Sequence, residues 1–166
     1  GADRRGRHRG LVVASLRRDP ARPERRTGGQ RALPHPRRGD SCAGQVRPDG
    51  DTLFLTDSTK VRLLGIDTPE VGENLECYGN EATDELRSLV PDGSRVMILA
   101  DVQPLDQYGR SLLFVYAEDG KLVNLELIED GMAEAVVLPP NVLFADELEA
   151  AEDHAQAAGA GMWGAC

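Results

Sequence analysis

The chain has 166 residues, of which 28 are acidic and 19 are Lys or Arg, and its formal net charge is −9. This length suits one domain with a tail, and no apolar run reaches the roughly 18 residues of a membrane-spanning helix. Residues 41–166 contain a single histidine, His154, which argues against Ser-His-Asp hydrolases, Cys-His hydrolases and His-rich metal sites.

The charge is divided unevenly along the chain. Residues 1–40 hold 12 arginines and four acids, a net +8, whereas residues 41–166 hold seven basic and 24 acidic residues, a net −17. Four prolines and little apolar sequence predict a disordered tail or leader for residues 1–40. Two interpretations of this tail stay open: a basic arm that holds nucleic acid, or a leader, linker or overextended gene start. Residues 41–166 would form the folded domain.

The acidic part shows short strand patterns with helical patterns among them. Strands are predicted at 42–47, 52–55, 60–66, 95–100 and 110–117, with a further extended segment at 132–137. Helices are predicted at 80–89, 122–129 and 142–158, each followed by a proline or glycine that can end it. This order predicts a mainly β domain with α: a five-stranded OB-fold Greek-key barrel with three helices.

The stretch 61–70, V-R-L-L-G-I-D-T-P-E, begins as an apolar strand and ends in two acids around a proline. Pro69 has no N–H and keeps Thr68 extended, so the strand must stop there. Asp67 then lies at a strand end, beside the carbonyl of Thr68, and Glu70 follows three residues later. These groups are oxygen ligands for a hard cation and a carboxylate that can accept a proton.

Two turns elsewhere supply matching groups. D-G-D-T at 49–52 places Asp51 at the mouth of a strand, and D-Q-Y-G-R at 106–110 places Arg110 at the mouth of another. Together with the stretch 61–70, these turns give two acids for a metal (Asp51 and Asp67) and two arginines for a phosphate (Arg62 and Arg110). The carboxylate of Glu70 is then left over.

The spacing of Arg62 and Asp67 makes a geometric prediction. The two residues are five apart, and a regular strand would place their side chains on opposite faces. If both serve one site, the strand must bend or bulge between them, and Gly65 is the expected place.

The chain resembles the staphylococcal nuclease (thermonuclease) family from about residue 44 to residue 163. The resemblance rests on D-G-D-T, R-L-L-G-I-D-T-P-E, Y-G-N-E-A, D-Q-Y-G-R, G-K-L-V-N and a closing W-G, in that order. It implies the OB-type barrel and a Ca2+-dependent nuclease that hydrolyses phosphodiester bonds of DNA and RNA and leaves 3′-phosphates. Single-stranded or denatured substrates would be favoured, and the protein would act as a monomer.

With this resemblance, we interpret Asp51 and Asp67 as carboxylate ligands of one Ca2+, with the backbone carbonyl of Thr68 as a third ligand. Glu70 would act as general base on a water or orient that water for attack on phosphorus. The ordinary alternatives are turn-capping aspartates and a solvated loop glutamate.

Arg62 and Arg110 would each donate bidentate hydrogen bonds to the phosphate. The alternative for Arg62 is a surface ion pair. The resemblance places Tyr108 along the nucleotide cleft, and the alternative is a turn aromatic packed on the barrel.

Cys77 stands in C-Y-G and Cys166 closes W-G-A-C. Some secreted relatives carry such a pair, so the resemblance predicts a Cys77–Cys166 disulfide and leaves Cys42 over. The alternative is three unrelated small apolar residues. A bridge would suggest export, hence a secreted or cell-surface protein.

The sequence also departs from the family's best-known member, which has a lysine-rich loop after the catalytic glutamate and tyrosines near 136–138. Here residues 71–77 are acidic and residues 136–138 are aliphatic. We therefore expect weak, salt-sensitive substrate binding. Two other functions stay open: a non-catalytic OB-fold module that binds nucleic acid or protein, and an acidic module that recruits a basic partner.

Overall fold

The computed structural model of the chain describes residue 34, residues 41–46 and residues 50–166. Its contacts divide the chain into residues 1–33 and residues 34–166, and the fold given below is that of the second unit. The predicted tail, apart from residue 34, lies outside the described residues. Within the described part, no helix has the length and apolar character needed to cross a membrane.

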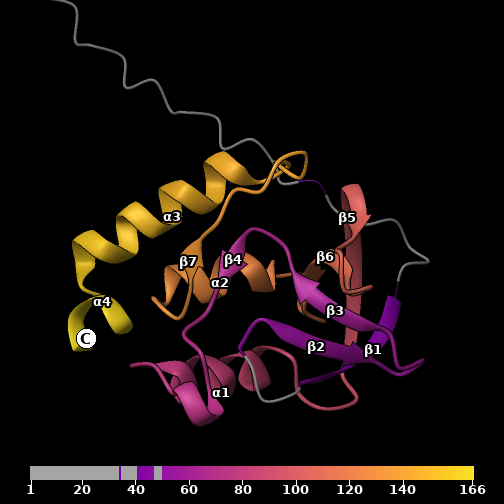
Figure 1. The fold of residues 1–166 in the computed structure, drawn as a ribbon, viewed down its shortest axis with the longest axis horizontal. Coiled ribbons are helices and arrows are strands. Elements are labelled where there is room, and N and C mark those ends of the chain that lie inside the picture. The colour runs from indigo at the N-terminus through magenta and orange to yellow at the C-terminus, as the bar shows by residue number, and fades with distance from the viewer. Residues whose placement is uncertain (1–33, 35–40, 47–49) are drawn as a thin grey trace, which may run out of the picture. The chain divides into compact units, whose positions relative to one another are not determined.

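Five strands pair in the order β1-β2-β3-β6-β5, and β5 pairs again with β1 to give a closed barrel (Figure 1). These strands are β1 Ser41–Val46, β2 Thr52–Leu55, β3 Lys60–Leu63, β5 Arg95–Leu105 and β6 Ser111–Tyr116. The pairs are antiparallel except for β3 with β6, which is parallel. Two short strands, β4 Ile66–Asp67 and β7 Glu134–Ala135, form a separate antiparallel pair.

The three predicted helices are present, so the mixed fold of strands and helices agrees with the sequence. They are α1 Gly79–Leu89, α2 Val123–Glu129 and α3 Ala145–Ala158. α2 contacts both α1 and α3, which lie on different sides of the molecule (Figure 1). A one-turn helix, α4 Met162–Ala165, and a 3-10 turn, η1 Gly72–Asn74, were not predicted, because a single turn has too few residues for a periodic pattern.

The third helix begins at Ala145 rather than at residue 142 because the segment before it is tied to β5. The side chain of Asn141 accepts a hydrogen bond from the backbone N–H of Gln103 (2.7 Å) and donates one to its carbonyl (3.0 Å). The backbone N–H of Leu143 donates to the carboxylate of Asp101 (2.9 Å). These bonds hold residues 141–143 in a non-helical conformation.

Strand β5 also differs from its prediction, which ended at residue 100. It runs to Leu105, with a register shift against β6 between Ala100 and Leu105. Pro104 lies within this irregular stretch, where the regular ladder of hydrogen bonds is interrupted. By contrast, the extended segment predicted at 132–137 pairs only at β7.

The strand predicted at 60–66 is broken, as the spacing of Arg62 and Asp67 required. β3 ends at Leu63, the next two residues form a turn, and Gly65 has φ +77°. The buried side chain of Asn124 fixes this turn, because its Nδ2 donates to the carbonyl of Leu64 (2.8 Å) while its Oδ1 accepts the N–H of Val115 (2.9 Å). The chain therefore leaves the barrel at Gly65 and enters β4.

The helices and the barrel share an apolar core. Phe114 of β6 and Phe144, just before α3, are fully buried and meet edge to face with their ring centroids 4.6 Å apart. Directly after α4, Cys166 is joined to Cys77 by the predicted disulfide. The prediction for Cys42 concerns a side chain outside the described part.

A substitution at Gly65 tests how strongly the turn between β3 and β4 depends on glycine. We expect Gly65→Ala to lower the free energy of unfolding by about 2–5 kcal/mol, because left-handed backbone costs about 1–2 kcal/mol and overpacking adds about 1–3 kcal/mol. The overpacking arises because an added Cβ would overlap Cδ1 of Leu148. Urea denaturation measures the change.

Gly93→Ala is the matched control. Gly93 has φ +81°, but no atom lies within 4 Å of an added Cβ. Gly93→Ala should lower the free energy of unfolding only by the backbone contribution of about 1–2 kcal/mol. Equal losses in the two variants would contradict the proposed clash at Gly65.

Candidate active site

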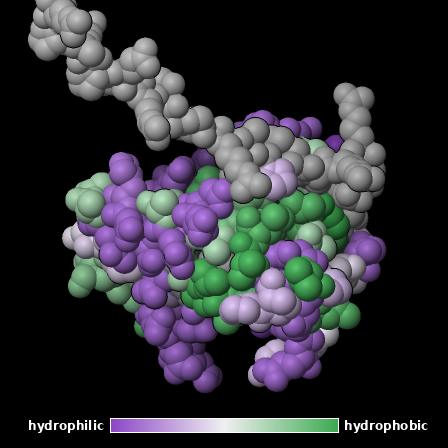
Figure 2. All heavy atoms as spheres, turned by 90° about the horizontal axis from the view of Figure 1, so that it is seen from above, coloured by the Kyte–Doolittle hydropathy of each residue, from purple (hydrophilic) through white to green (hydrophobic). Residues whose placement is uncertain are grey.

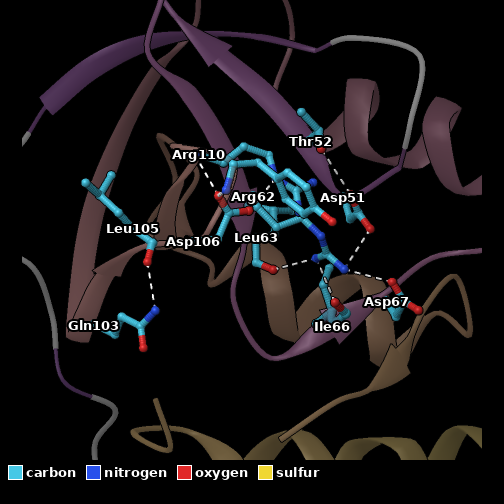
Figure 3. A network of polar contacts seen from close by, with 11 residues as sticks. Asp51, Thr52, Arg62, Leu63, Ile66, Asp67, Gln103, Leu105, Asp106 and Arg110 are labelled. Atoms are coloured by element: carbon cyan, nitrogen blue, oxygen red, sulfur yellow. Dashed lines mark hydrogen bonds and ion pairs between the residues drawn. The ribbon is translucent and has the colours of Figure 1, made fainter. Parts of the chain in front are cut away.

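Arg62 lies at the centre of a polar network at one end of the barrel (Figure 3). Its Nη1 donates to the carbonyls of Leu63 (2.7 Å) and Ile66 (2.8 Å). Its Nη2 lies 2.7 Å from Oδ1 of Asp67 and 3.0 Å from Oδ2 of Asp51. One nitrogen therefore touches both predicted metal-binding carboxylates, which converge on a single point.

The strand register explains this convergence. Arg62 of β3 is paired with Thr52 of β2, which brings the turn before β2 next to Arg62, and the carboxylate of Asp51 in that turn contacts the guanidinium. The hydroxyl of Thr52 donates to Oδ1 of Asp51 (3.1 Å), and the backbone N–H of Leu63 donates to the Asp51 carbonyl (2.9 Å). The turn at Gly65 brings Asp67 back to the same side. Asp51 is mostly buried, with 12% of its side chain exposed, whereas 61% of the Asp67 side chain is exposed.

Arg110 is held by Asp106, a residue for which the sequence predicted no role of its own. Oδ2 of Asp106 accepts from Nε of Arg110 (2.6 Å), and Oδ1 accepts the backbone N–H groups of Tyr108 and Arg110 (both 2.8 Å). Desolvation raises the pKa of Asp106, but the hydrogen bonds from Arg110 and Tyr108 outweigh it, so this pKa lies below the ordinary aspartate value. An Asp four residues before an Arg, with Gly109 between them, was the available signal in the sequence.

All six residues predicted for catalysis and metal binding meet in one pocket of about 200 Å³. The pocket is lined by Asp51, Arg62, Asp67, Thr68, Pro69, Glu70 and Arg110. They come from the turn before β2, from β3, from β4 with the loop after it, and from the turn before β6. This arrangement excludes a scatter of these side chains over different sides of the barrel.

Tyr108 does not line this pocket. It is 76% exposed, so it is not packed on the barrel as a turn aromatic would be. Cζ of Arg110 lies 5.7 Å from the centroid of its ring, which is within the range of a cation–π contact. The proposed role of Tyr108 in the nucleotide cleft stays a prediction.

A second pocket, of about 370 Å³, adjoins the first and shares Arg62 and Arg110 with it. Its wall includes aliphatic side chains and the amide side chains of Gln103, Gln107 and Asn141. The aliphatic residues Val136 and Leu138 contribute to it, and none of the aromatic residues that the structure describes does. Figure 2 shows one face of the molecule, on which apolar side chains gather between hydrophilic areas.

The donors of the first pocket fit a hard cation. In the described part of the chain, no cluster of three or more His, Cys, Asp or Glu side chains is arranged around a metal position. The available ligands are the carboxylates of Asp51 and Asp67 and the carbonyl of Thr68, all of them oxygens. The positive Nη2 of Arg62 already lies between the two carboxylates, which shows that their charges favour a cation at that point.

The comparisons with known proteins agree with this arrangement. The family described as "Staphylococcal nuclease homologue" matches residues 60–165. The chain is 32% identical over 132 residues to a thermonuclease of Staphylococcus intermedius, covering 76% of this chain and 77% of that protein. It is also 32% identical over 122 residues to a thermonuclease of Staphylococcus hyicus, covering 69% of this chain and 70% of that protein.

A third relative is longer than this chain. The SPbeta prophage-derived endonuclease YokF of Bacillus subtilis (strain 168) is 34% identical over 122 residues, which is 69% of this chain but only 41% of that protein. Together these matches define a nuclease-type hydrolase. The chain belongs to the staphylococcal nuclease family.

The lowered pKa of Asp106 gives a pH test. Because the folded state holds this carboxylate in its charged form, its contribution to stability is present above the unfolded pKa of about 3.8 and is lost as the pH falls through the lower folded pKa. At pH 7, we expect Asp106→Asn to be less stable than the parent by about 0.5–1.5 kcal/mol. Urea denaturation at a series of pH values should show this difference shrinking below pH 4.

Asp92→Asn is the control, because Asp92 is exposed and has no hydrogen-bond or ion-pair partner among the described residues. Its difference from the parent should stay small at every pH. A difference for Asp106→Asn that persists unchanged in acid would contradict a stabilising charge at this position.

Proposed function

We propose that this chain is a Ca2+-dependent nuclease on an OB-type barrel, which hydrolyses phosphodiester bonds of DNA and RNA and leaves 3′-phosphates. The observation that carries the proposal is the meeting of two carboxylates, a third carboxylate and two arginines in one pocket of about 200 Å³. A module that only bound nucleic acid or protein would have no need of this set. Membership of the staphylococcal nuclease family supports the same activity.

In this proposal, Asp51, Asp67 and the carbonyl of Thr68 hold the Ca2+, and water and substrate oxygens complete its shell. Three protein ligands are few, so the ion alone should bind weakly. When bound, the ion would supply positive charge for the phosphate and lower the pKa of a bound water.

In this proposal, Glu70 accepts the proton of the attacking water. It lines the same pocket, its residue is exposed, and its carboxylate has no hydrogen-bond or ion-pair partner among the described residues. A carboxylate without such a partner keeps its lone pairs for a water molecule. This distinguishes Glu70 from Asp51 and Asp67, whose carboxylates contact Arg62.

The two arginines would neutralise the phosphate. The bonds from Nη1 of Arg62 to two carbonyls fix the plane of the Arg62 guanidinium. The bond from Nε of Arg110 to Asp106 fixes the Arg110 guanidinium in the same way. On substrate binding, phosphate oxygens would replace the carboxylates that now pair with Arg62, those of Asp51 and Asp67. As negative charge grows on the non-bridging oxygens during attack, the bonds from both arginines strengthen and lower the barrier.

The neighbouring pocket of about 370 Å³ suits a nucleotide base next to the scissile phosphate. Its aliphatic wall offers apolar contact without the aromatic stacking that gives about 1–3 kcal/mol per base. Residues 41–166 carry a net charge of −17, which repels a polyanion. The substrate would therefore bind weakly and in a salt-sensitive way, and a single strand, whose bases are free to enter the pocket, is the favoured form.

We also propose that the protein is secreted or exposed at the cell surface. The support is the Cys77–Cys166 disulfide, because such bonds persist in oxidising compartments.

The central test is digestion of heat-denatured DNA. The purified chain should degrade it with Ca2+ and should stop when EDTA removes the ion. Glu70→Gln should lower kcat by about 10²–10⁴-fold, the range typical of general-base catalysis.

Glu73→Gln is the matched control, since Glu73 is an exposed acid three residues away that does not line the pocket. It should keep the parent activity. If neither EDTA nor the Glu70→Gln substitution lowered the rate of digestion, the mechanism would be refuted.

The role of Arg110 can be separated from general loss of positive charge. Arg110→Ala should lower kcat by about 10²–10³-fold, as the loss of one donor to a developing oxyanion does. Arg87→Ala removes the same charge from the outer surface of α1, where Arg87 pairs with Asp84 (3.0 Å), and should leave kcat unchanged. Equal effects of the two substitutions on single-turnover rates would count against a phosphate contact by Arg110.

A further inference from the structure

The loop that carries Glu70 has no anchor of its own in the core. Pro69 ends the extended segment before it, and none of residues 70–77 is buried. The 3-10 turn η1 within the loop likewise contains no buried residue. The direction of the Glu70 side chain must therefore be set by local bonds rather than by packing.

Both backbone hydrogen bonds of Glu70 are made with Glu76. The backbone N–H of Glu70 donates to Oε2 of Glu76 (3.0 Å), and the backbone N–H of Glu76 donates to the carbonyl of Glu70 (2.9 Å). Both backbone polar groups of Glu70 are thus bonded to one residue six positions later. This reciprocal pair closes the loop at its base.

Glu76 is in turn connected to the body of the protein. The next residue, Cys77, is bridged to Cys166, whose backbone N–H donates to the carbonyl of Met162 (2.9 Å). Met162 is buried, and its own N–H donates to the carbonyl of Gly131 (2.9 Å). A continuous path of bonds therefore runs from the loop through α4 to the end of α2.

The start of α1 supports the loop from the other side. Gly79 is buried, its N–H donates to the carbonyl of Glu76 (3.2 Å), and a Cβ added to it would overlap the carbonyl oxygen of Glu70. The backbone of Glu70 is therefore held between Glu76 and the first turn of α1.

We propose that Glu76 is a positioning residue for Glu70: its carboxylate holds the Glu70 backbone so that the Glu70 carboxylate faces the pocket. This inference rests on the proposed nuclease function, in which Glu70 accepts a proton. Glu76 itself is not among the residues that line the pocket. Its effect should appear in kcat, because small displacements of a reacting group cost rate more than they cost substrate binding.

The experiment compares three variants in the full chain with Ca2+ and denatured DNA. Glu76→Ala removes the acceptor, and kcat should fall about 10- to 100-fold while KM changes less than about twofold. Glu76→Gln keeps an acceptor oxygen, and kcat should stay within about threefold of the parent. Glu73→Ala removes a charge from the same loop without removing a bond, and it should behave as the parent does. Thermal unfolding of each variant verifies that it is folded.

A double substitution shows whether Glu76 acts through Glu70. In a Glu70→Gln background, Glu76→Ala should cost less than about twofold further activity, because residues that act as one unit are not additive. A full additional loss there would assign Glu76 a merely structural role and overturn the inference. It would equally be overturned if Glu76→Ala matched Glu73→Ala, or if it raised KM at constant kcat.

These outcomes are distinct from failure of the proposed function. If the parent chain showed no Ca2+-dependent digestion, or if Glu70→Gln were fully active, the nuclease mechanism would fail and the positioning role would fall with it. If the parent were active and Glu70→Gln were not, a silent Glu76→Ala would remove the positioning role alone.

Discussion

The candidate site depends on the break in the chain at Gly65. A regular strand through residues 60–67 would send Arg62 and Asp67 to opposite faces, and no pocket could contain both. The left-handed backbone at Gly65 and the bonds of Asn124 turn the chain out of the barrel, and Nη2 of Arg62 then lies 2.7 Å from Asp67. The same guanidinium bonds the carbonyls on either side of the turn, so the site and the bend stabilise each other.

Much of this could be predicted because the decisive residues have restrictive chemistry. Pro69 limits where a strand can end, and Gly65 marks where it can bend. The three longer helices followed from apolar spacing and from the residues that end them. The site residues were identifiable because acids and arginines stand at the ends of three predicted strands, in motifs that resemble one family.

The remainder depends on contacts between distant segments or on irregular backbone. α3 begins three residues later than predicted because Asn141 and Leu143 are hydrogen-bonded to β5, about 40 residues earlier. The local sequence pattern around residue 142 does not indicate such bonds. The sequence showed the loop after Glu70 only as acidic and short. That one of its acids, Glu76, accepts a hydrogen bond from the Glu70 backbone is visible only in the folded chain.

The parallel pairing of β3 with β6 has a consequence for the order in which the protein matures. It joins Val61 to Ser111 and so places Arg110 beside residues from the first half of the domain. Contacts of such sequence separation form slowly, after local turns and helices. A chain still emerging from the ribosome, with residues 111–116 not yet free, would have its carboxylates and Arg62 but no docked Arg110. The candidate site would then be assembled late in synthesis, only once β6 has paired with β3.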